Sequence, residues 1–283
     1  MSGRPALPLS VRELSGFLGV PAARRIREEF LPAVDEPRWR DLAEEFMRLD
    51  GPATAYAHPW FTPMPFEACP GSGAHHAHVG GLALHVLQDL ENAKALLKVH
   101  ASRGLPARPG LVYAAILLHD AMKRFVYRFN ERFELEKSED PFIGRNEDHH
   151  SWVLRELTAR NADRELLLAV AAMHGLDDVT LAGGVRPLAV VNHYLSLSGS
   201  GLTMTADDVR PEHVIGFLSD SDWPASGAAQ ARCRALAGRL APGLGLGADY
   251  VLVHLGSRLG FERADAVNAL HGPEEVVRLA FRD

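Results

Sequence analysis

A histidine followed directly by an aspartate interrupts an apolar run in the middle of the chain. In "AAILLHDAMK", His119 and Asp120 stand among aliphatic residues that suit a buried helix. Burying an imidazole and a carboxylate is costly unless each finds a partner. A divalent metal ion is such a partner, and mixed nitrogen and oxygen ligands suit zinc, iron, manganese or nickel. Lys123, three residues after Asp120, falls on the same helical face and would hold a phosphate near the metal.

The other histidines gather in the same part of the sequence. The chain has 14 histidines, and ten of them lie between His75 and His193. The segment "HHAHVGGLALHVLQDL", residues 75–90, holds four within eleven positions, although histidine is a poor helix former. Such a concentration at the entrance of an expected helix indicates a chemical role for some of these imidazoles.

Separate helices are expected to carry one candidate ligand each. His85 lies on the helix expected from residue 79, His150 near the start of the helix over 146–161, and His174 at the end of the next. A lone histidine is more often a surface residue or a hydrogen-bonded core residue. If the helices bundle, however, their inward imidazoles converge, and bundle cores are a common place for metal sites.

Helical spacing recurs along the whole chain, and no sustained alternation typical of strands is found. The sequence therefore predicts an all-α fold. The prolines and glycines of residues 51–73 predict a long irregular segment. The turn-rich stretch "DWPASG", residues 222–227, indicates a boundary between two parts of the chain. The predicted parts are N-terminal helices with the Pro/Gly-rich loop (1–73), a metal-binding helical domain (74–225) and a C-terminal helical extension (226–283).

Composition narrows the function classes. The 283 residues are 47% hydrophobic and 23% charged, with a net charge of −6, which does not favour nonspecific binding to a phosphate backbone. Cys69 and Cys233 lack a CxxC spacing and form no disulfide framework. No signal-peptide pattern and no membrane-length apolar run is present. We expect a cytoplasmic protein with no membrane partner.

The ordered histidines resemble the HD superfamily of metal-dependent phosphohydrolases. "HHAHVGGLALH" looks like the H-H-x-x-x-G-G-L-x-x-H segment of HD-type 3′–5′ exoribonucleases and of relaxase-associated HD domains, and "LLHDAMK" looks like the family's H-D-x-x-K. The resemblance covers residues 75–197 and implies an HD-domain helical bundle, here with extra N- and C-terminal helices. It implies one or two divalent ions (Mn, Fe, Ni or Zn) held by His85, His119, Asp120, His150 and His174. It also implies catalytic roles for Asp120, Lys123 and His76.

Two positions leave the implied ligand set open. His149 is the alternative to His150, which we prefer because Val153 and Leu157 follow it at i+3 and i+7 on an apolar stripe. Val153 and Leu157 thus set the expected core-facing side of that helix.

The second open position is the last ligand. The family ends with an aspartate on the last core helix, and Ser196 stands there, with Asn192 one turn earlier. Serine is a poor replacement for a carboxylate ligand. Asp220 and Asp222 in "LSDSDWP" are candidates to substitute for it.

The resemblance implies hydrolysis of a phosphate ester or phosphodiester in a nucleotide or short oligonucleotide by metal-activated water. No GxSxG motif offers a competing nucleophile. The absence of an oligonucleotide-binding barrel before the motif argues against a processive exoribonuclease. Two alternatives stand beside this prediction: a di-iron HD-type oxygenase of a small molecule, and a degenerate HD domain that binds a nucleotide as a regulatory module. A homo-oligomer is compatible with the sequence.

Overall fold

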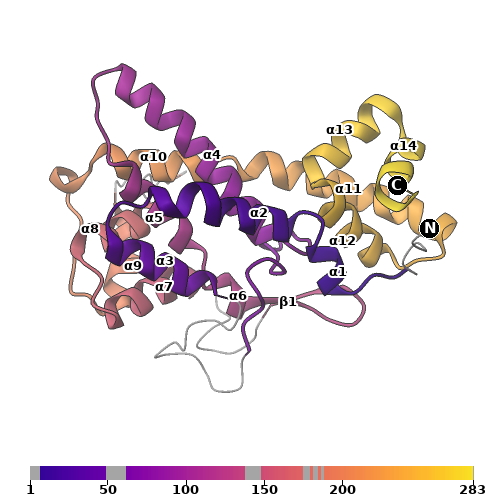
Figure 1. The fold of residues 1–283 in the computed structure, drawn as a ribbon, viewed down its shortest axis with the longest axis horizontal. Helices are drawn as coiled ribbons and strands as arrows, with labels where there is room; N and C mark the ends of the chain where they lie inside the picture. Colours follow the sequence, from indigo (N-terminus) through magenta and orange to yellow (C-terminus); the bar gives the residue numbers. More distant parts are fainter. Residues whose placement is uncertain are drawn as a thin grey trace.

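The computed structural model of the chain describes residues 7–48, 62–137, 148–174, 179–180, 184–185 and 188–282. Across these residues the protein is helical, with two pairs of very short strands (Figure 1). The predicted all-α class is confirmed. No helix within the described ranges combines the length and the apolar character needed to cross a membrane.

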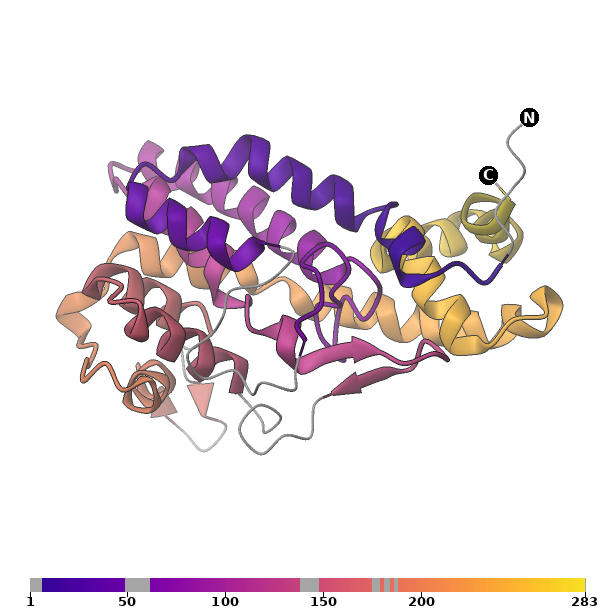
Figure 2. The ribbon, with the colours of Figure 1, turned by 60° about the horizontal axis from the view of Figure 1, so that its bottom comes forward.

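The N-terminal helices form a layer against the central bundle. They are α1 (Val11–Ser15), α2 (Gly19–Arg25), which continues through a π-helical turn (Ile26–Phe30) and a 3-10 turn (Leu31–Ala33), and α3 (Pro37–Met47). A capping box between Ser10 and Glu13 starts α1. In Figure 2, α2 lies beside α4, and α3 packs on α5. Residues 51–61 of the expected Pro/Gly-rich loop lie outside the described residues, whereas Phe66 and Cys69 after them are buried in the main core.

The central bundle surrounds one fully apolar helix. Its members are α4 (Gly81–Ser102), α5 (Pro109–His119), α6 (Lys123–Val126), α7 (Asp148–Ala159), α8 (Arg164–Ala172), α9 (Ala189–Ser198) and α10 (Pro211–Asp220). Every residue of α5 from Gly110 to His119 is buried, and the helix packs against α3, α4, α8 and α10. A helix that is hydrophobic all round must be covered on all sides, so α5 is the axis of the bundle.

The C-terminal helices enclose a second hydrophobic cluster. They are α11 (Trp223–Leu244), α12 (Ala248–Leu259), α13 (Phe261–His271) and α14 (Pro273–Val277), followed by a π-helical turn (Arg278–Arg282). Figure 1 shows them in yellow and orange at one end of the molecule. The boundary expected between residues 225 and 226 falls inside α11. Pro224 lies in the first turn of that helix, where proline is tolerated, so "DWPASG" spans the start of a helix.

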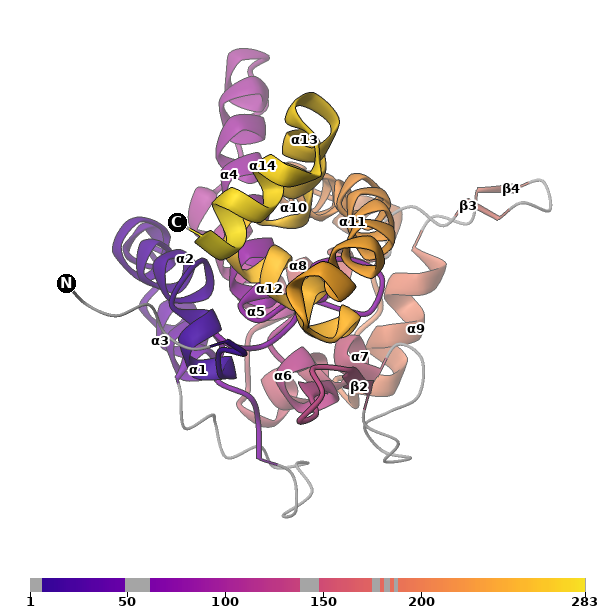
Figure 3. The same ribbon diagram turned by 90° about the vertical axis from the view of Figure 1, so that its right-hand side faces the viewer.

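Two short strand pairs were not predicted from the sequence. β1 (Tyr127–Phe129) pairs antiparallel with β2 (Leu135–Lys137), and β3 (Val179–Thr180) with β4 (Gly184–Val185). Strands of two or three residues are too short to show alternation. The turn of the first hairpin reaches α12, where the ring of Phe133 lies 5.0 Å from that of Tyr250. The second pair lies at the edge of the molecule in Figure 3.

Candidate metal centre

His119 and Asp120 lie where the central helix ends. His119 is the last residue of α5, and Asp120 follows it in the turn before α6. The Nδ1–H group of His119 donates to the carbonyl of Ile116 over 2.7 Å, which leaves Nε2 with a free lone pair. That Nε2 atom is buried and has no hydrogen-bond partner. A backbone carbonyl that fixes the tautomer in this way is the usual support of a metal-binding histidine.

Four buried side chains form what we call the inner cluster. They are His85 and Asp89 from α4, His119 from α5 and Asp220 from α10, and one ligand atom of each lies within 4.8 Å of the others. The Nε2 atom of His85 lies 3.2 Å from Asp220 Oδ1 and 3.5 Å from Asp89 Oδ2. The packing of α10 against α4 and α5 brings the three helices to this point.

Four further side chains form the rim cluster, which is less buried: Asp120, His149, His150 and His174. Asp120 Oδ1 lies 3.4 Å from His149 Nε2 and 3.7 Å from His174 Nε2. His150 stacks on His174, with ring centroids 3.7 Å apart, and its Nδ1 lies 3.0 Å from the hydroxyl of Tyr194 on α9.

Two carboxylates join the clusters. Asp120 Oδ2 lies 3.1 Å from His85 Nε2 in the inner cluster, while Oδ1 faces the rim. Asp220 Oδ1 faces His85, and its Oδ2 lies 3.3 Å from His174 Nε2. The arrangement therefore provides two adjacent ligand sets with bridging carboxylates, as in two-metal sites.

The structure brings together the residues that the sequence nominated as ligands: His85, His119, Asp120, His150 and His174. Lys123 joins them through an ion pair with Asp120. The sequence favoured His150 over His149 as a ligand, but both side chains reach the rim cluster from the first turn of α7. His149 is the one whose Nε2 atom faces Asp120.

Ser196 and Asn192 do not reach either cluster. Ser196 is exposed on α9, and its hydroxyl donates to the carbonyl of His193. The amide group of Asn192 binds the backbone of Met204 through both its oxygen and its nitrogen. Asp220 from α10 contributes a buried carboxylate to the inner cluster.

Of the two substitutes considered from the sequence, only Asp220 belongs to the inner cluster. Asp222 is exposed and accepts a hydrogen bond from Asn92. Asp220 and Asp222 are thus only two positions apart in the sequence, but the first is buried in the inner cluster and the second is exposed.

Asp89 was missed by sequence reasoning. It lies one helical turn after His85 on α4, on the same face as the buried Leu82 and Val86. Its carboxylate is fully buried, and neither oxygen has a hydrogen-bond partner. The i, i+4 spacing from His85 on an apolar face was the signal that could have identified it.

The histidine loop, residues 71–78, is fastened at both ends. Gly80 starts α4 with a φ of 82°, and a Cβ on Gly81 would overlap the carbonyl oxygen of His76, which explains the "GG" pair. Gln230 on α11 accepts a hydrogen bond from the amide of Ala77 and donates to the carbonyl of Gly73, both over 2.9 Å. The loop is thus held by α4 on one side and α11 on the other.

The charges of the site call for a cation. Asp89, Asp120 and Asp220 are all buried, and Lys123 is the one lysine or arginine that an ion pair joins to them within the described residues. Burial raises the pKa of Asp89 well above its usual value. Burial alone would lower the pKa of His85, but the carboxylates, Asp89 first, outweigh it and raise that pKa well above its usual value. In the metal-free protein, protons on Asp89 and His85 neutralise buried negative charge that a bound divalent ion would otherwise neutralise. The donor set therefore fits such an ion.

The rim and loop imidazoles make the metal-free protein acid-sensitive. Burial lowers the pKa of His75 to about 2 and that of His174 to about 3, from 6.5 for a free side chain. Below pH 6.5 the unfolded chain binds protons that the folded chain does not, so the free energy of unfolding falls by about 1.4 kcal/mol per pH unit for each group. The raised pKa of His85 acts above pH 6.5 and does not offset this loss. The raised pKa of Asp89 opposes part of it, because the folded carboxyl binds a proton that the unfolded chain does not. The lowered pKa values of His76, His149 and His150 add to the loss. We expect at least about 2 kcal/mol of stability to be lost between pH 6.5 and 5.

Urea unfolding of chelator-treated protein measures this loss. Replacing His174 with Phe is expected to remove about 1.4 kcal/mol per pH unit from the slope. A stability that stays constant from pH 6.5 to 5 would contradict the assignment of neutral buried imidazoles.

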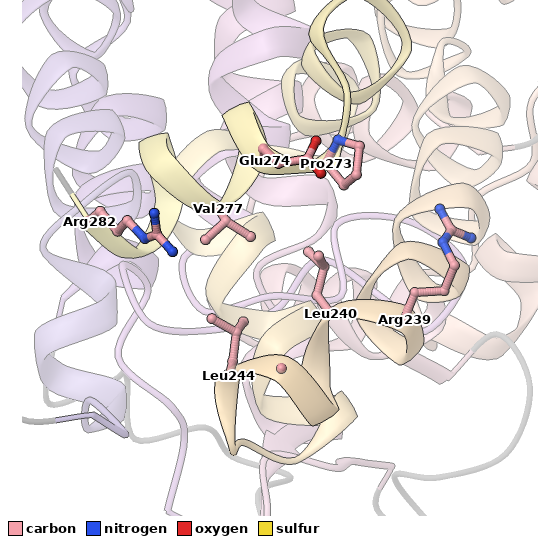
Figure 4. A pocket seen from close by; sticks show the side chains of 8 residues that line it. Arg239, Leu240, Leu244, Pro273, Glu274, Val277 and Arg282 are labelled. Carbon is pink, nitrogen blue, oxygen red and sulfur yellow. The ribbon is translucent and has the colours of Figure 1, made fainter.

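A separate groove lies among the C-terminal helices. It has a volume of about 260 Å³ and is lined by apolar side chains from α11 and α14, with Arg239 and Arg282 at its edges (Figure 4). None of its lining residues belongs to either metal-ligand cluster. The groove is therefore not part of the metal centre.

Comparison with known proteins identifies no relative. No family model, no curated protein and no solved structure matches this chain. The assignment of the metal centre rests on the residues of this chain, and the resemblance to the HD superfamily stays a prediction.

Proposed function

We propose that the chain is an HD-type metal-dependent phosphohydrolase that cleaves a phosphate ester or phosphodiester of a nucleotide or short oligonucleotide. One observation carries the proposal: two His/Asp clusters lie side by side, and Asp120 of the rim cluster places its second carboxylate oxygen 3.1 Å from His85 Nε2 of the inner cluster. We assign one divalent ion to the inner cluster and one to the rim cluster. When bound, such ions activate water near neutral pH and polarise a phosphoryl oxygen.

The protein's own residues supply position and charge. Ile116 fixes the His119 tautomer, and Tyr194 supports His150, so both rings are held before any ion arrives. Lys123 is buried, and burial, which lowers its pKa, is outweighed by Asp120, which raises it, so the amine stays charged. A fixed ammonium beside the bridging carboxylate would stabilise negative charge that develops on the phosphoryl group.

The cysteines offer no competing nucleophile. Burial raises the pKa of both Cys69 and Cys233 to about 12, so neither forms a thiolate at neutral pH. Water is therefore the nucleophile that the proposal requires.

The donor set also supports a second candidate, a di-iron oxygenase of a small molecule. Imidazoles and bridging carboxylates in a helical bundle suit two irons as well as two zinc or manganese ions. The other alternative, a degenerate nucleotide-binding module, was motivated by serine at position 196. The buried carboxylate of Asp220 beside His85 and His119 supports an intact metal centre over that alternative.

Metal content and turnover test the proposal together. The protein is purified without chelator, analysed for metals, stripped, and reloaded with manganese, iron, nickel or zinc. We expect at least two equivalents, and hydrolysis of bis(p-nitrophenyl) phosphate and short oligonucleotides that chelation abolishes and metal restores. Phosphoester turnover that persists in chelator overturns the proposal. Oxygen consumption by the iron-loaded protein without phosphoester turnover favours the oxygenase.

A further inference from the structure

A third group of imidazoles lies against the inner cluster. His75, His76 and His85 are all buried, and one ring nitrogen of each lies within 4.8 Å of the others. His85 belongs to both groups, whereas His75 and His76 come from the histidine loop and take no part in the inner or rim cluster. Three imidazoles without a carboxylate form a donor set of different chemistry from the other two.

An amide oxygen orients the middle ring. His76 Nε2 lies 2.7 Å from the side-chain oxygen of Gln88, which only accepts hydrogen bonds. Nε2 therefore carries the proton, and Nδ1 carries the lone pair. That Nδ1 atom lies 3.0 Å from Nδ1 of His75. An imidazole that donates one N–H to a carbonyl and presents its other nitrogen has the outer support of a metal ligand.

The backbone at His76 is held in an unusual conformation. Its φ is 54°, in the left-handed region that few residues other than glycine adopt. Its carbonyl accepts hydrogen bonds from the amides of Gly71 and His78 over 2.9 and 2.8 Å. Backbone strain of about 1–3 kcal/mol is maintained only where the surroundings enforce it, and it concentrates at functional sites.

We propose that His75, His76 and His85 form an additional site for a transition-metal ion that prefers nitrogen ligands, such as Zn²⁺ or Co²⁺. The two Nδ1 atoms of the loop are separated by 3.0 Å, close to the roughly 3.3 Å between ligand atoms of a tetrahedral ion with bonds of about 2.0 Å. The site rests on the proposed metal centre, because His85 is shared with the inner cluster. Both ring nitrogens of His85 are buried without a hydrogen-bond partner. With an ion at each nitrogen, the ring would have released its N–H proton to solvent and would act as an imidazolate. Ions that prefer oxygen, such as Mn²⁺, leave it empty.

Counting bound ions in matched variants tests this site. Stripped full-length protein is reloaded with Co²⁺ or with Mn²⁺, bound metal is measured by elemental analysis, and the visible Co²⁺ spectrum is recorded. His76→Asn removes the imidazole and keeps a residue that tolerates a positive φ. Gln88→Leu removes only the supporting oxygen. His100→Asn changes a histidine of α4 that belongs to none of the three groups.

We expect three equivalents of Co²⁺ but two of Mn²⁺ in the wild type and in His100→Asn. His76→Asn is expected to bind two of Co²⁺, and Gln88→Leu to bind the third Co²⁺ about 10- to 100-fold more weakly. Two equivalents of Co²⁺ in the wild type, unchanged by His76→Asn, overturn the additional site and leave the metal centre standing. Loss of all ions in His76→Asn also overturns the additional site, since the His76 ring would then be needed for folding of the whole metal centre and not as a ligand of one ion. A wild type that binds no ion overturns both proposals.

Discussion

Replacing Asp120 with Asn is expected to abolish metal binding in both clusters and to lower phosphoester turnover by about a thousandfold or more. One oxygen of Asp120 faces His85 and the other faces His149, so the substitution removes a carboxylate that touches both clusters. Loss of about 4 kcal/mol of charge stabilisation by the ions corresponds to that factor. Elemental analysis and steady-state kinetics on the same preparation measure the two effects.

The same substitution leaves Lys123 buried without an ionised partner, which is expected to cost about 3–5 kcal/mol of stability. The double variant Asp120→Asn with Lys123→Met removes both charges. It therefore distinguishes the loss of a metal ligand from the loss of stability. We expect it to recover most of the stability in urea unfolding and still to bind no metal. Metal retained at wild-type stoichiometry in either variant would contradict the assignment of Asp120 as the shared ligand.

A second large effect is expected at Asp220 and not at Asp222. Asp220→Asn removes a ligand of the inner cluster and is expected to lose one equivalent of metal. Outer-shell changes at metal sites cost about 10- to 100-fold, so loss of this ligand should lower turnover by about a hundredfold or more. The buried carboxylate lies 3.2 Å from His85 Nε2 and 3.3 Å from His174 Nε2.

Asp222→Asn is the matched control, since it makes the same chemical change two residues away on the surface. We expect wild-type metal content and turnover, with at most a small change from the lost contact with Asn92. Equal losses of metal and turnover in the two variants would mean that Asp220 acts through net charge and not as a ligand. Ser196→Ala serves as a further control, and we expect it to change neither metal content nor turnover.

Much of the site could be predicted because its polar residues contrast with their apolar context. His119 and Asp120 stand out at the end of the apolar helix α5, and the order of the other histidines along the chain indicated which of them are ligands. Asp89 was hidden because a single acid on a long helix with many charges resembles a solvated residue. Only the packing of α10 on α4 shows that Asp89 faces inward.

The misplaced last carboxylate has a different cause. Ser196 was located by counting along the chain, but which helix contributes a ligand depends on how helices pack. α9 packs on α7 and presents Tyr194 to the rim, whereas α10 packs on α4, α5 and α8 and presents Asp220. The helices themselves were predicted from their periodicity. The short strand pairs and the start of α11 at Trp223 were not, because local patterns of two or three residues carry too little signal.

The hydrogen bonds through Gln230 join two regions that look separate in the ribbon. They tie the histidine loop to α11, and the ring of His78 fits so closely against Gly256 of α12 that a Cβ there would overlap it. Opening of the C-terminal helices would therefore release the loop. The bundle and these helices should unfold as one cooperative unit, and the amide hydrogen of Ala77 should exchange with solvent only when that unit opens.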